Sequence, residues 1–445
     1  METPFSGTWS ALLRDLILEE RIPEAPPGIT REVVLPQLKG KTLVLIGVRR
    51  SGKTTQMMRM MAGLRQQGVA RENILHMNFF DDRLAGFGRM QFQELVEAFY
   101  STRKGNTEPA YAFLDEIQEI EGWEGFVNRA QEQLKWRIYL TGSSARMLSK
   151  EVASSMRGRS LTYELFPYSF REFLRARALP EAVDSIESRS MIRMGCEAYL
   201  VEGGFPETTG LDDRLRTQLH QSYFASILQR DLIFRNNASH PLVVRDLALK
   251  LMHDNGTLQS INRLTGTLKS MGHSAPRPFV AACLDWTHDA FLFFPVPIHT
   301  NSFTKRQANP CKWYCVDQGM VRSIVSKFTA DRGRLLENMV FLSLRRQGIQ
   351  PAYHRTKSGK EVDFVWKGED GRMQLIQVCW DLSVEATRER EVSAMVEAIT
   401  ELKAADARII TWETNYETPD FESGTKVKIR TQSAWRFLLE EKAPV

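Results

Sequence analysis

The chain has 445 residues, of which 42% are hydrophobic and 25% are charged, and its formal net charge is +5 at pH 7. This is the composition of a globular protein, and at about 150 residues per domain the length predicts about two to four domains. No apolar run approaches the roughly 18 residues that a membrane-spanning helix needs, so we expect no membrane segment. The mild basic excess permits contact with nucleic acid but does not require it.

The N-terminal sequence and the cysteines both bear on the cellular compartment. The N-terminus mixes acidic and basic residues without a continuous apolar segment, which argues against a secretory signal. Cys311 and Cys315 could bind zinc, but no second Cys or His pair follows at finger spacing, so a buried strand is favoured. We therefore expect a cytoplasmic protein without a disulfide framework, whose five thiols are Cys196, Cys283, Cys311, Cys315 and Cys379.

The first part of the chain is predicted to be a helix followed by an α/β core. Apolar residues at helical spacing predict a lead-in helix within residues 1–29, ending before Pro23. From Thr42 onward, short apolar runs alternate with helical segments as far as RIYLTGS, at residues 137–143. Such alternation predicts a parallel sheet covered on both faces, in a domain at residues 30–175.

After Phe166 and Pro167 the pattern changes to long helical stretches, which predict a helical module at residues 176–330. Within it, residues 258–294 are expected to form two short helices and a third helix with the sequence LDWTHDAF, followed by the strand FLFFPVPI. This is the order of a winged helix-turn-helix, a geometry that serves contacts with DNA or with proteins.

The last part of the chain, residues 331–445, is predicted to be a third domain with alternating helices and strands. It begins with the helix RLLENMVFLSLRRQG and continues through the strands EVDFVW and LIQVCW. A helix then precedes the strand ARIITW, and the helix SAWRFLLEE ends the chain. These segments indicate an α/β domain of mixed strand direction.

The segment GVRRSGKT matches the pattern Gly-x4-Gly-Lys-Thr and lies between a predicted strand and a predicted helix, as a phosphate-binding loop does. Its glycines let backbone amides face phosphate oxygens, and the helix N-terminus adds positive dipole charge. We expect Lys53 to reach the β- and γ-phosphates of ATP, and Thr54 to ligate magnesium (Mg2+). The residues expected to bind the nucleotide are Gly47, Val48, Arg49, Arg50, Ser51, Gly52, Lys53, Thr54 and Thr55.

Two further groups of polar residues follow predicted strands of the same core. The apolar strand AYAFL ends in Asp115 and Glu116, at the edge where open α/β sheets bind ligands. Asp115 suits magnesium binding through water, and Glu116 suits activation of the attacking water as a general base. The next strand ends near Ser143, which either senses the γ-phosphate or caps a helix. Together these features predict binding and hydrolysis of ATP.

The motifs GVRRSGKT, YAFLDEIQ, YLTGSSA and MRGRSLTYELFPYSFREFL together resemble those of the AAA-type P-loop ATPases of bacteria and archaea. The GGFPE turn at Gly203–Glu207 resembles a turn in the helical module of the same family. The resemblance implies an arginine that reaches the γ-phosphate of the same or a neighbouring subunit, and it implies a homo-oligomer. Arg157 and Arg159 are the matching positions, although two arginines beside a glycine also suit a solvated turn.

The third domain resembles the restriction-endonuclease-like fold, known as the PD-(D/E)XK nuclease fold. An active member would hold a divalent cation with carboxylates, and a lysine would steady the attacking water. Glu337 and Asp363 match two acidic positions, but Gln377 and Cys379 stand where an acid and a lysine are expected. A neutral amide and a thiol cannot fill those roles, so the resemblance implies a catalytically degenerate domain.

The sequence thus predicts an α/β protein with an AAA-type ATPase core, a winged-helix-like middle domain and a nuclease-like C-terminal domain. The leading hypothesis is an ATPase whose turnover is coupled to a partner, DNA or protein, through the last two domains. The alternative hypothesis is a slow nucleotide-regulated switch that contacts proteins and no nucleic acid. A metal-dependent nuclease driven by ATP is disfavoured by Gln377 and Cys379.

Overall fold

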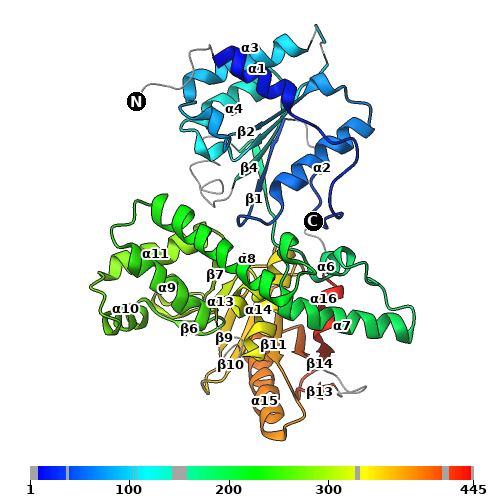
Figure 1. The fold of residues 1–445 in the computed structure, drawn as a ribbon. Coiled ribbons are helices and arrows are strands. Elements are labelled where there is room, and N and C mark those ends of the chain that lie inside the picture. Colours follow the sequence, from blue (N-terminus) through cyan, green and yellow to red (C-terminus); the bar gives the residue numbers. More distant parts are fainter. Residues whose placement is uncertain are drawn as a thin grey trace. The chain divides into compact units, whose positions relative to one another are not determined.

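The computed structural model describes residues 9–36, 40–103, 105–106, 108–142, 158–325, 331–412 and 420–441. The chain forms two compact units, Met1–Leu165 and Phe166–Val445 (Figure 1). Helix α6 (Phe170–Ala176), which the sequence analysis placed in the first domain, belongs to the second unit, where it packs against α7 and α16. The two compact units therefore divide before α6.

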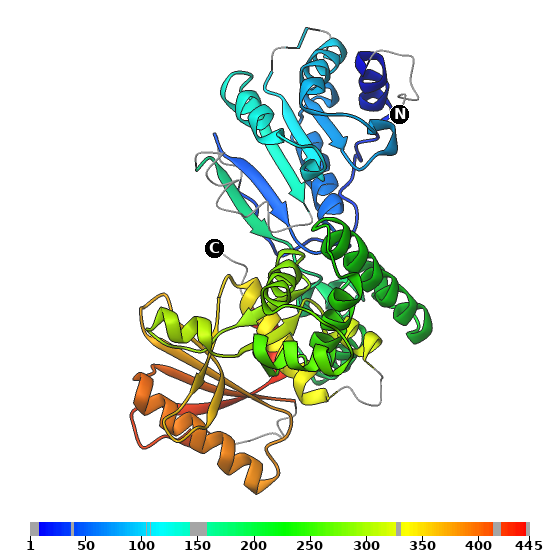
Figure 2. The same cartoon turned by 90° about the vertical axis from the view of Figure 1, so that its left-hand side faces the viewer.

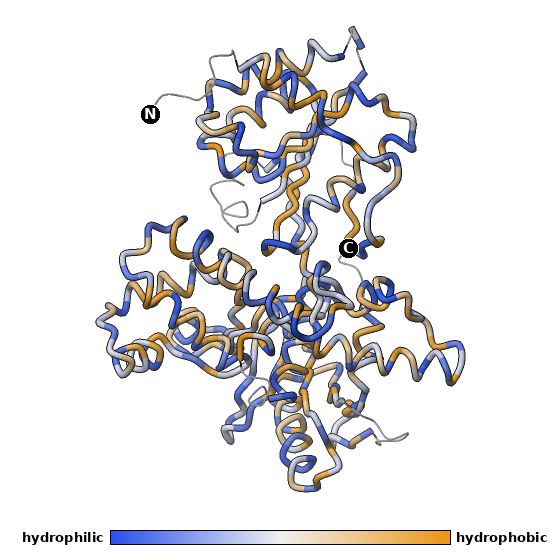
Figure 3. The backbone as a smooth tube through the Cα atoms, in the orientation of Figure 1, coloured by the Kyte–Doolittle hydropathy of each residue, from blue (hydrophilic) through white to orange (hydrophobic). Residues whose placement is uncertain are grey.

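The first unit is built on a five-stranded sheet, in which all neighbouring strands are parallel and follow the order β2-β3-β4-β1-β5. Its strands are β1 (Thr42–Ile46), β2 (Ile74–Asn78), β3 (Tyr111–Asp115), β4 (Arg137–Gly142) and β5 (Ser160–Glu164). Apolar residues run along its central strands (Figure 3). The parallel sheet predicted from the strand-helix alternation is confirmed, and it brings the carboxyl ends of β1, β3 and β4 to one edge.

Strand β5 was not foreseen in the sequence. Every residue of Ser160–Glu164 is only half-buried, so the segment lacks the apolar run that marks β1 and β3. It becomes a strand because it pairs with β1 along its full length, from Thr42 opposite Ser160 to Ile46 opposite Glu164. Pairing with a distant segment therefore decided this element.

The helices of the first unit are α1 (Trp9–Glu19), α2 (Lys53–Gln66), α3 (Phe92–Thr102) and α4 (Trp123–Glu132). Short 3-10 turns are η1 (Arg71–Asn73), η2 (Asp82–Leu84), η3 (Arg89–Gln91) and η4 (Ile117–Glu119). Met57 and Met61 of α2 pack with Leu43, Phe113 and Tyr139 of the sheet. This apolar contact anchors the start of α2 directly after β1.

The second unit begins with a bundle of helices that follows α6. Its members are α7 (Ile186–Glu202), α8 (Asp213–Ser226), the π-helix η7 (Ile227–Phe234), α9 (Pro241–His253) and α13 (Gln318–Ile324). The 3-10 turn η6 (Pro206–Thr208) and the short helix α12 (Phe303–Ala308) complete it. In the part of the chain that the structure describes, no helix has the length and apolarity to cross a membrane.

A small antiparallel sheet lies among these helices. It has the order β6-β8-β7, with β6 (Leu258–Gln259), β7 (Phe293–Val296) and β8 (Cys311–Cys315). Two helices, α10 (Ile261–Ser270) and α11 (Arg277–Asp289), lie between β6 and β7 in the sequence. The expectation of three helices here was wrong, because Val280, Cys283, Leu284 and Thr287 form one continuous buried face along α11.

The C-terminal part of the second unit contains a six-stranded sheet of mixed direction, with the order β13-β14-β12-β11-β10-β9. Its strands are β9 (Ala352–Arg355), β10 (Glu361–Lys367), β11 (Met373–Cys379), β12 (Asp406–Thr411), β13 (Phe421–Glu422) and β14 (Lys428–Ser433). The helices are α14 (Arg332–Arg346), α15 (Glu385–Leu402) and α16 (Ala434–Leu439). Figure 2 shows α15 lying along this sheet, where Met395 and Ile399 meet Val362 and Leu375.

The two sheets of the second unit are joined directly. Tyr314 of β8 stacks on Phe341 of α14 at a ring separation of 4.6 Å, and Phe364 of β10 lies 5.6 Å from Tyr314. Ile298 forms a parallel bridge with Tyr353 of β9. The middle and C-terminal domains expected from the sequence are therefore packed into one unit.

The GGFPE turn is tightly packed against other segments of the second unit. A Cβ atom on Gly203 would lie 2.2 Å from a carboxylate oxygen of Asp317, and one on Gly204 would lie 2.5 Å from the carbonyl oxygen of Tyr168. The Gly204 amide donates to Asp317 at 2.6 Å, and its carbonyl accepts from the Tyr168 amide at 2.6 Å. Both glycines are needed because no side chain fits between these segments.

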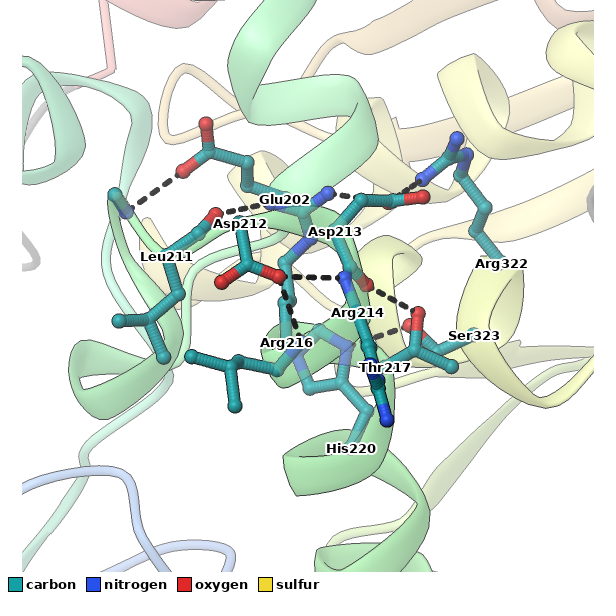
Figure 4. A network of polar contacts seen from close by, with 12 residues as sticks. Glu202, Leu211, Asp212, Asp213, Arg214, Arg216, Thr217, His220, Arg322 and Ser323 are labelled. Atoms are coloured by element: carbon teal, nitrogen blue, oxygen red, sulfur yellow. Dashed lines mark hydrogen bonds and ion pairs between the residues drawn. The ribbon is translucent and has the colours of Figure 1, made fainter.

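A network of polar contacts lies at the start of α8 and joins this helix to α13 (Figure 4). The carboxylate of Glu202 accepts from the Gly210 amide at 2.9 Å. Asp213 pairs with Arg216 at 2.6 Å and with Arg322 at 3.1 Å. These contacts give the charged side chains of this region a structural role.

Candidate functional site

The loop between β1 and α2 curves around the Lys53 side chain. Gly47 has a φ of +154°, and a Cβ atom there would lie 2.2 Å from the Leu165 carbonyl oxygen. Gly52, directly before α2, has a φ of +95°. The Lys53 ammonium is buried and donates to the carbonyls of Gly47 and Val48, at 3.0 Å each. The glycines thus allow the tight turn that places this cation inside the loop.

Several donors of this loop suit an anion. Helix α2 has 14 residues, no acidic residue in its first turn and no side-chain cap at Gly52. Its first amides therefore remain available to an oxygen ligand. The Ser51 hydroxyl is buried and has no hydrogen-bond partner among the described residues. Arg31, from the segment before β1, donates to the Ser51 carbonyl at 3.0 Å.

The ends of two strands and the start of α2 converge at the buried Asp115 carboxylate, which is 1% exposed. One of its oxygens accepts from the Thr54 hydroxyl at 2.6 Å, across 61 residues of sequence. The other accepts from the hydroxyl of Thr141, at the end of β4. Hydroxyl and carboxylate oxygens are the ligands that magnesium prefers, so Thr54 and Asp115 fit a magnesium site.

Glu116 adopts a left-handed backbone conformation, with φ +53° and ψ +39°. Such a conformation is uncommon for a residue with a side chain and persists where neighbouring contacts impose it. Here the Glu116 amide donates to the Thr141 hydroxyl at 3.1 Å, and the Glu116 carboxylate accepts from the Gln118 side chain. The carboxylate is half-buried, one residue beyond Asp115.

Other predicted residues of the ATP site do not join this cluster. Ser143 and Arg157 lie outside the described residues. The guanidinium of Arg49 lies 5.9 Å from the ring centre of Phe80, and Arg50 is exposed with a φ of +68°. Thr55 is exposed on the first turn of α2.

Arg159 lies at the end of the sheet opposite the phosphate loop. The next residue, Ser160, pairs with Thr42 at the start of β1, whereas the loop follows the end of β1. The length of β1 separates the two places by about 16 Å. Arg159 instead forms an ion pair with Glu132 of α4. Arg159 thus lies away from the phosphate loop of its own chain, and a contact with a neighbouring subunit and a solvated turn both stay predictions.

The nuclease-like residues of the third domain gather at one place in the second unit. Glu337 of α14 and Asp363 of β10 both pair with Lys312, at 2.9 and 2.7 Å. Gln377 accepts from the Asp363 amide at 3.1 Å and donates to Glu391 at 2.7 Å, so both ends of its amide are used. Burial raises the pKa of the Cys379 thiol to about 11, so this side chain is neutral at pH 7.

Sequence reasoning missed several residues of these sites. Arg31 carries no motif, and only folding brings it to Ser51. Gln118 ends the motif YAFLDEIQ, but its contact with the Glu116 carboxylate was not predicted. At the end of β4 the sequence analysis named Ser143, whereas it is Thr141 that contacts Asp115. Lys312 had a weak signal, because a lysine stands in the otherwise apolar strand CKWYC.

Comparisons with known proteins assign the regions of the chain. A model described as an AAA domain matches residues 39–174, and two domains of unknown function match residues 195–331 and 332–429. An uncharacterised protein of Methanocaldococcus jannaschii is 31% identical over 413 residues, which cover 90% of this chain and 89% of that protein. One of Haemophilus influenzae is 32% identical over 343 residues, covering 76% and 82%.

Solved structures with similarity to the chain include two archaeal proteins. A Walker-type ATPase of Pyrococcus abyssi has a TM-score of 0.38 and 15% identity, covering 65% of this chain and 92% of that one. The Orc1 protein of Aeropyrum pernix in complex with DNA has a TM-score of 0.29 and 14% identity, covering 64% and 86%.

The parallel sheet, the loop around Lys53 and the match over residues 39–174 define the first unit as a nucleotide-binding AAA-type P-loop ATPase domain. The chain as a whole belongs to the family of the uncharacterised Methanocaldococcus jannaschii and Haemophilus influenzae proteins, which it matches over most of their length. The two matched domains of unknown function both lie in the second unit.

Proposed function

We propose that the protein hydrolyses ATP at the Gly47–Thr55 loop with magnesium, and that it couples turnover to a partner bound by the second unit. The observation that carries the proposal is the 2.6 Å contact between Thr54 and Asp115, beside the buried Lys53 ammonium. This brings an ammonium group that can bind phosphate, and two oxygen ligands that suit magnesium, to one edge of the sheet.

Each residue of the cluster has a separate role in this proposal. Lys53 offsets the charge of the β- and γ-phosphates, and the first amides of α2 donate to phosphate oxygens. Thr54 and Asp115 hold magnesium, which when bound neutralises charge that develops on the phosphates. Glu116 takes the proton of the attacking water, and Gln118 orients its carboxylate.

Two substitutions separate binding from chemistry. Lys53→Ala should abolish ATP binding, whereas Glu116→Gln should bind ATP normally and lose about 100-fold or more in turnover. Calorimetry with ATP and a phosphate-release assay on both variants measure the two steps. If Glu116→Gln loses as much binding as Lys53→Ala, Glu116 is not the general base.

DNA is the first partner to test. Helices α10 and α11 follow β6 and precede the antiparallel strands β7 and β8, an order that supports a winged-helix-like module. In such modules the second helix enters the DNA groove. Turnover stimulated by single-stranded, duplex or branched DNA, with a steep loss as salt rises, would support DNA as the partner.

The charges of α11 favour the alternative, a nucleotide-regulated switch that contacts a protein. This helix exposes Asp285, and Arg277 at its start is the one Lys or Arg among its residues. An exposed carboxylate on a groove-facing helix opposes phosphate contact. If ATP turnover is slow and no form of DNA changes it at low salt, the protein is a nucleotide-regulated switch that contacts a protein.

A further inference from the structure

The nuclease-like carboxylates surround a lysine that comes from another sheet. Lys312 stands on β8, the central strand of the small β6-β8-β7 sheet, and is 4% exposed. Its ammonium lies 2.9 Å from Glu337, 2.8 Å from Glu361 and 2.7 Å from Asp363. One cation thus contacts three carboxylates, which come from α14 and β10.

The surroundings of this cluster are closed by protein groups. The Tyr314 hydroxyl donates to Glu337 at 2.5 Å, and the second Asp363 oxygen accepts from the Val378 amide at 2.9 Å. A Cβ atom on Gly256 would lie 3.7 Å from a Glu337 oxygen. Burial alone would lower the pKa of Lys312, but the carboxylates of Asp363 and Glu337 outweigh it and raise that pKa above its ordinary value. The lysine is therefore charged.

A divalent metal ion does not fit these residues as they stand. Metal-oxygen distances are about 2.0–2.6 Å, so an ion among these carboxylates would need the space that the ammonium fills. Gln377 lies at the position of the missing acid. Its side-chain oxygen accepts from the Asp363 amide, and its side-chain nitrogen donates to Glu391. Within the described ranges, no group of three or more His, Cys, Asp or Glu side chains is arranged to hold a metal.

We propose that the Lys312 ammonium occupies the place of the metal ion in the nuclease-like site. Its ion pairs thereby hold the β6-β8-β7 sheet against the C-terminal sheet. The acidic residues of the predicted nuclease-like pattern then serve as partners of a side chain from residues 176–330, across the boundary expected from the sequence. These ion pairs explain why Glu337, Glu361 and Asp363 lie beside residues that cannot support cleavage. This inference concerns the second unit and holds whatever the partner of the ATPase is.

The first test asks whether removing the lysine opens a cation site. Full-length, nucleotide-free proteins that all carry Asp115→Asn, which removes the phosphate-site carboxylate, are titrated with Mn2+ by calorimetry. Lys312→Ala should bind Mn2+ at least tenfold more tightly than the protein with Lys312, and its Tm should rise in Mn2+. The control, Lys312→Ala with Asp363→Asn, should lose both effects.

A second test does not depend on metal binding. Lys312→Met keeps the length of the side chain and removes its charge, which should lower the Tm by on the order of 10 °C because three buried carboxylates lose their cation. Glu361→Gln should lower the Tm when Lys312 is present and raise it when Met replaces Lys312. This inversion of sign requires a charge contact, and a role in packing alone would not produce it.

Two outcomes would overturn the proposal. One is Asp363-dependent Mn2+ binding by the protein that retains Lys312, since the metal and the lysine would then share the site. The other is an effect of Glu361→Gln that has the same sign with Lys312 and with Met at that position. If Lys312→Ala does not fold, the sign of the Glu361→Gln effect decides alone.

Discussion

Replacing Thr141 by valine tests the hydroxyl that joins the two acidic residues of the ATP site. The Thr141 side chain is fully buried and donates to Asp115, and its oxygen accepts from the Glu116 amide at 3.1 Å. Valine has nearly the same shape, so packing is retained while both hydrogen bonds are lost. A bond to a charged group contributes about 1.5–3 kcal/mol and a bond between neutral groups about 0.5–1.5 kcal/mol. We expect the first unit to lose about 2–4 kcal/mol of stability.

The same change should slow hydrolysis, because the Glu116 backbone loses one of the contacts that hold its left-handed conformation. A misplaced base of this kind should reduce turnover by about 10- to 100-fold. Hydrogen exchange of the β3 and β4 amides measures stability, and phosphate release measures turnover. Thr141→Ser is the matched control, since it keeps the hydroxyl and loses one methyl group. Equal stability and turnover in the valine and serine variants would refute this role of the hydroxyl.

Three further predictions concern other parts of the molecule. Arg159→Ala should lower turnover by about a thousandfold only if the arginine acts across subunits, and mixing it with Lys53→Ala subunits should then restore part of the activity in a phosphate-release assay. Burial and the Asp363 carboxylate raise the pKa of Glu337 from 4.5 to about 7, so its stabilising contribution is present below pH 4.5 and is lost as the pH rises through 7. Glu337→Gln should therefore remove about 2–3 kcal/mol of the difference in unfolding free energy between pH 4.5 and pH 8. Gly204→Ala should destabilise the second unit by about 1–3 kcal/mol or more, measured by urea unfolding, because its methyl group would meet the Tyr168 carbonyl.

The C-terminal domain gives a prediction about nuclease activity that follows from the same contacts. The wild-type protein should cleave neither DNA nor RNA in excess magnesium or manganese, because Gln377 and Cys379 supply neither a carboxylate nor an ammonium. Gel assays with several nucleic-acid forms check this, with Asp363→Ala as the control. Cleavage that disappears in Asp363→Ala would show that the domain is an active nuclease.

Local sequence determined the phosphate loop and the elements around it. The apolar runs LVLI in β1 and AYAFL before Asp115 predict central strands, and Gly47, Gly52 and Lys53 predict the turn between strand and helix. These features depend on neighbours within a few residues, so they can be read without the fold. The same is true of the helices α14 and α15, whose apolar spacing is regular.

Other features depended on contacts between distant segments. Strand β5 has no apolar pattern of its own, and the place of Arg159 follows from the pairing of β5 with β1. The sequence placed Arg159 near the end of the core but could not tell which end of the sheet it occupies. That distinction decides whether the arginine can serve its own chain.

The sequence by itself determined that this protein has an ATP-binding loop and an acidic strand end, and it predicted a nuclease-like domain with two unsuitable residues. Only the tertiary structure decided which cation pairs with Glu337 and Asp363, because Lys312 reaches Asp363 across 51 residues and from a different sheet. A motif records residues that are close in the chain, whereas a buried charge is balanced by whichever partner the fold brings within about 3 Å. The identity of that partner is therefore a property of the packed unit.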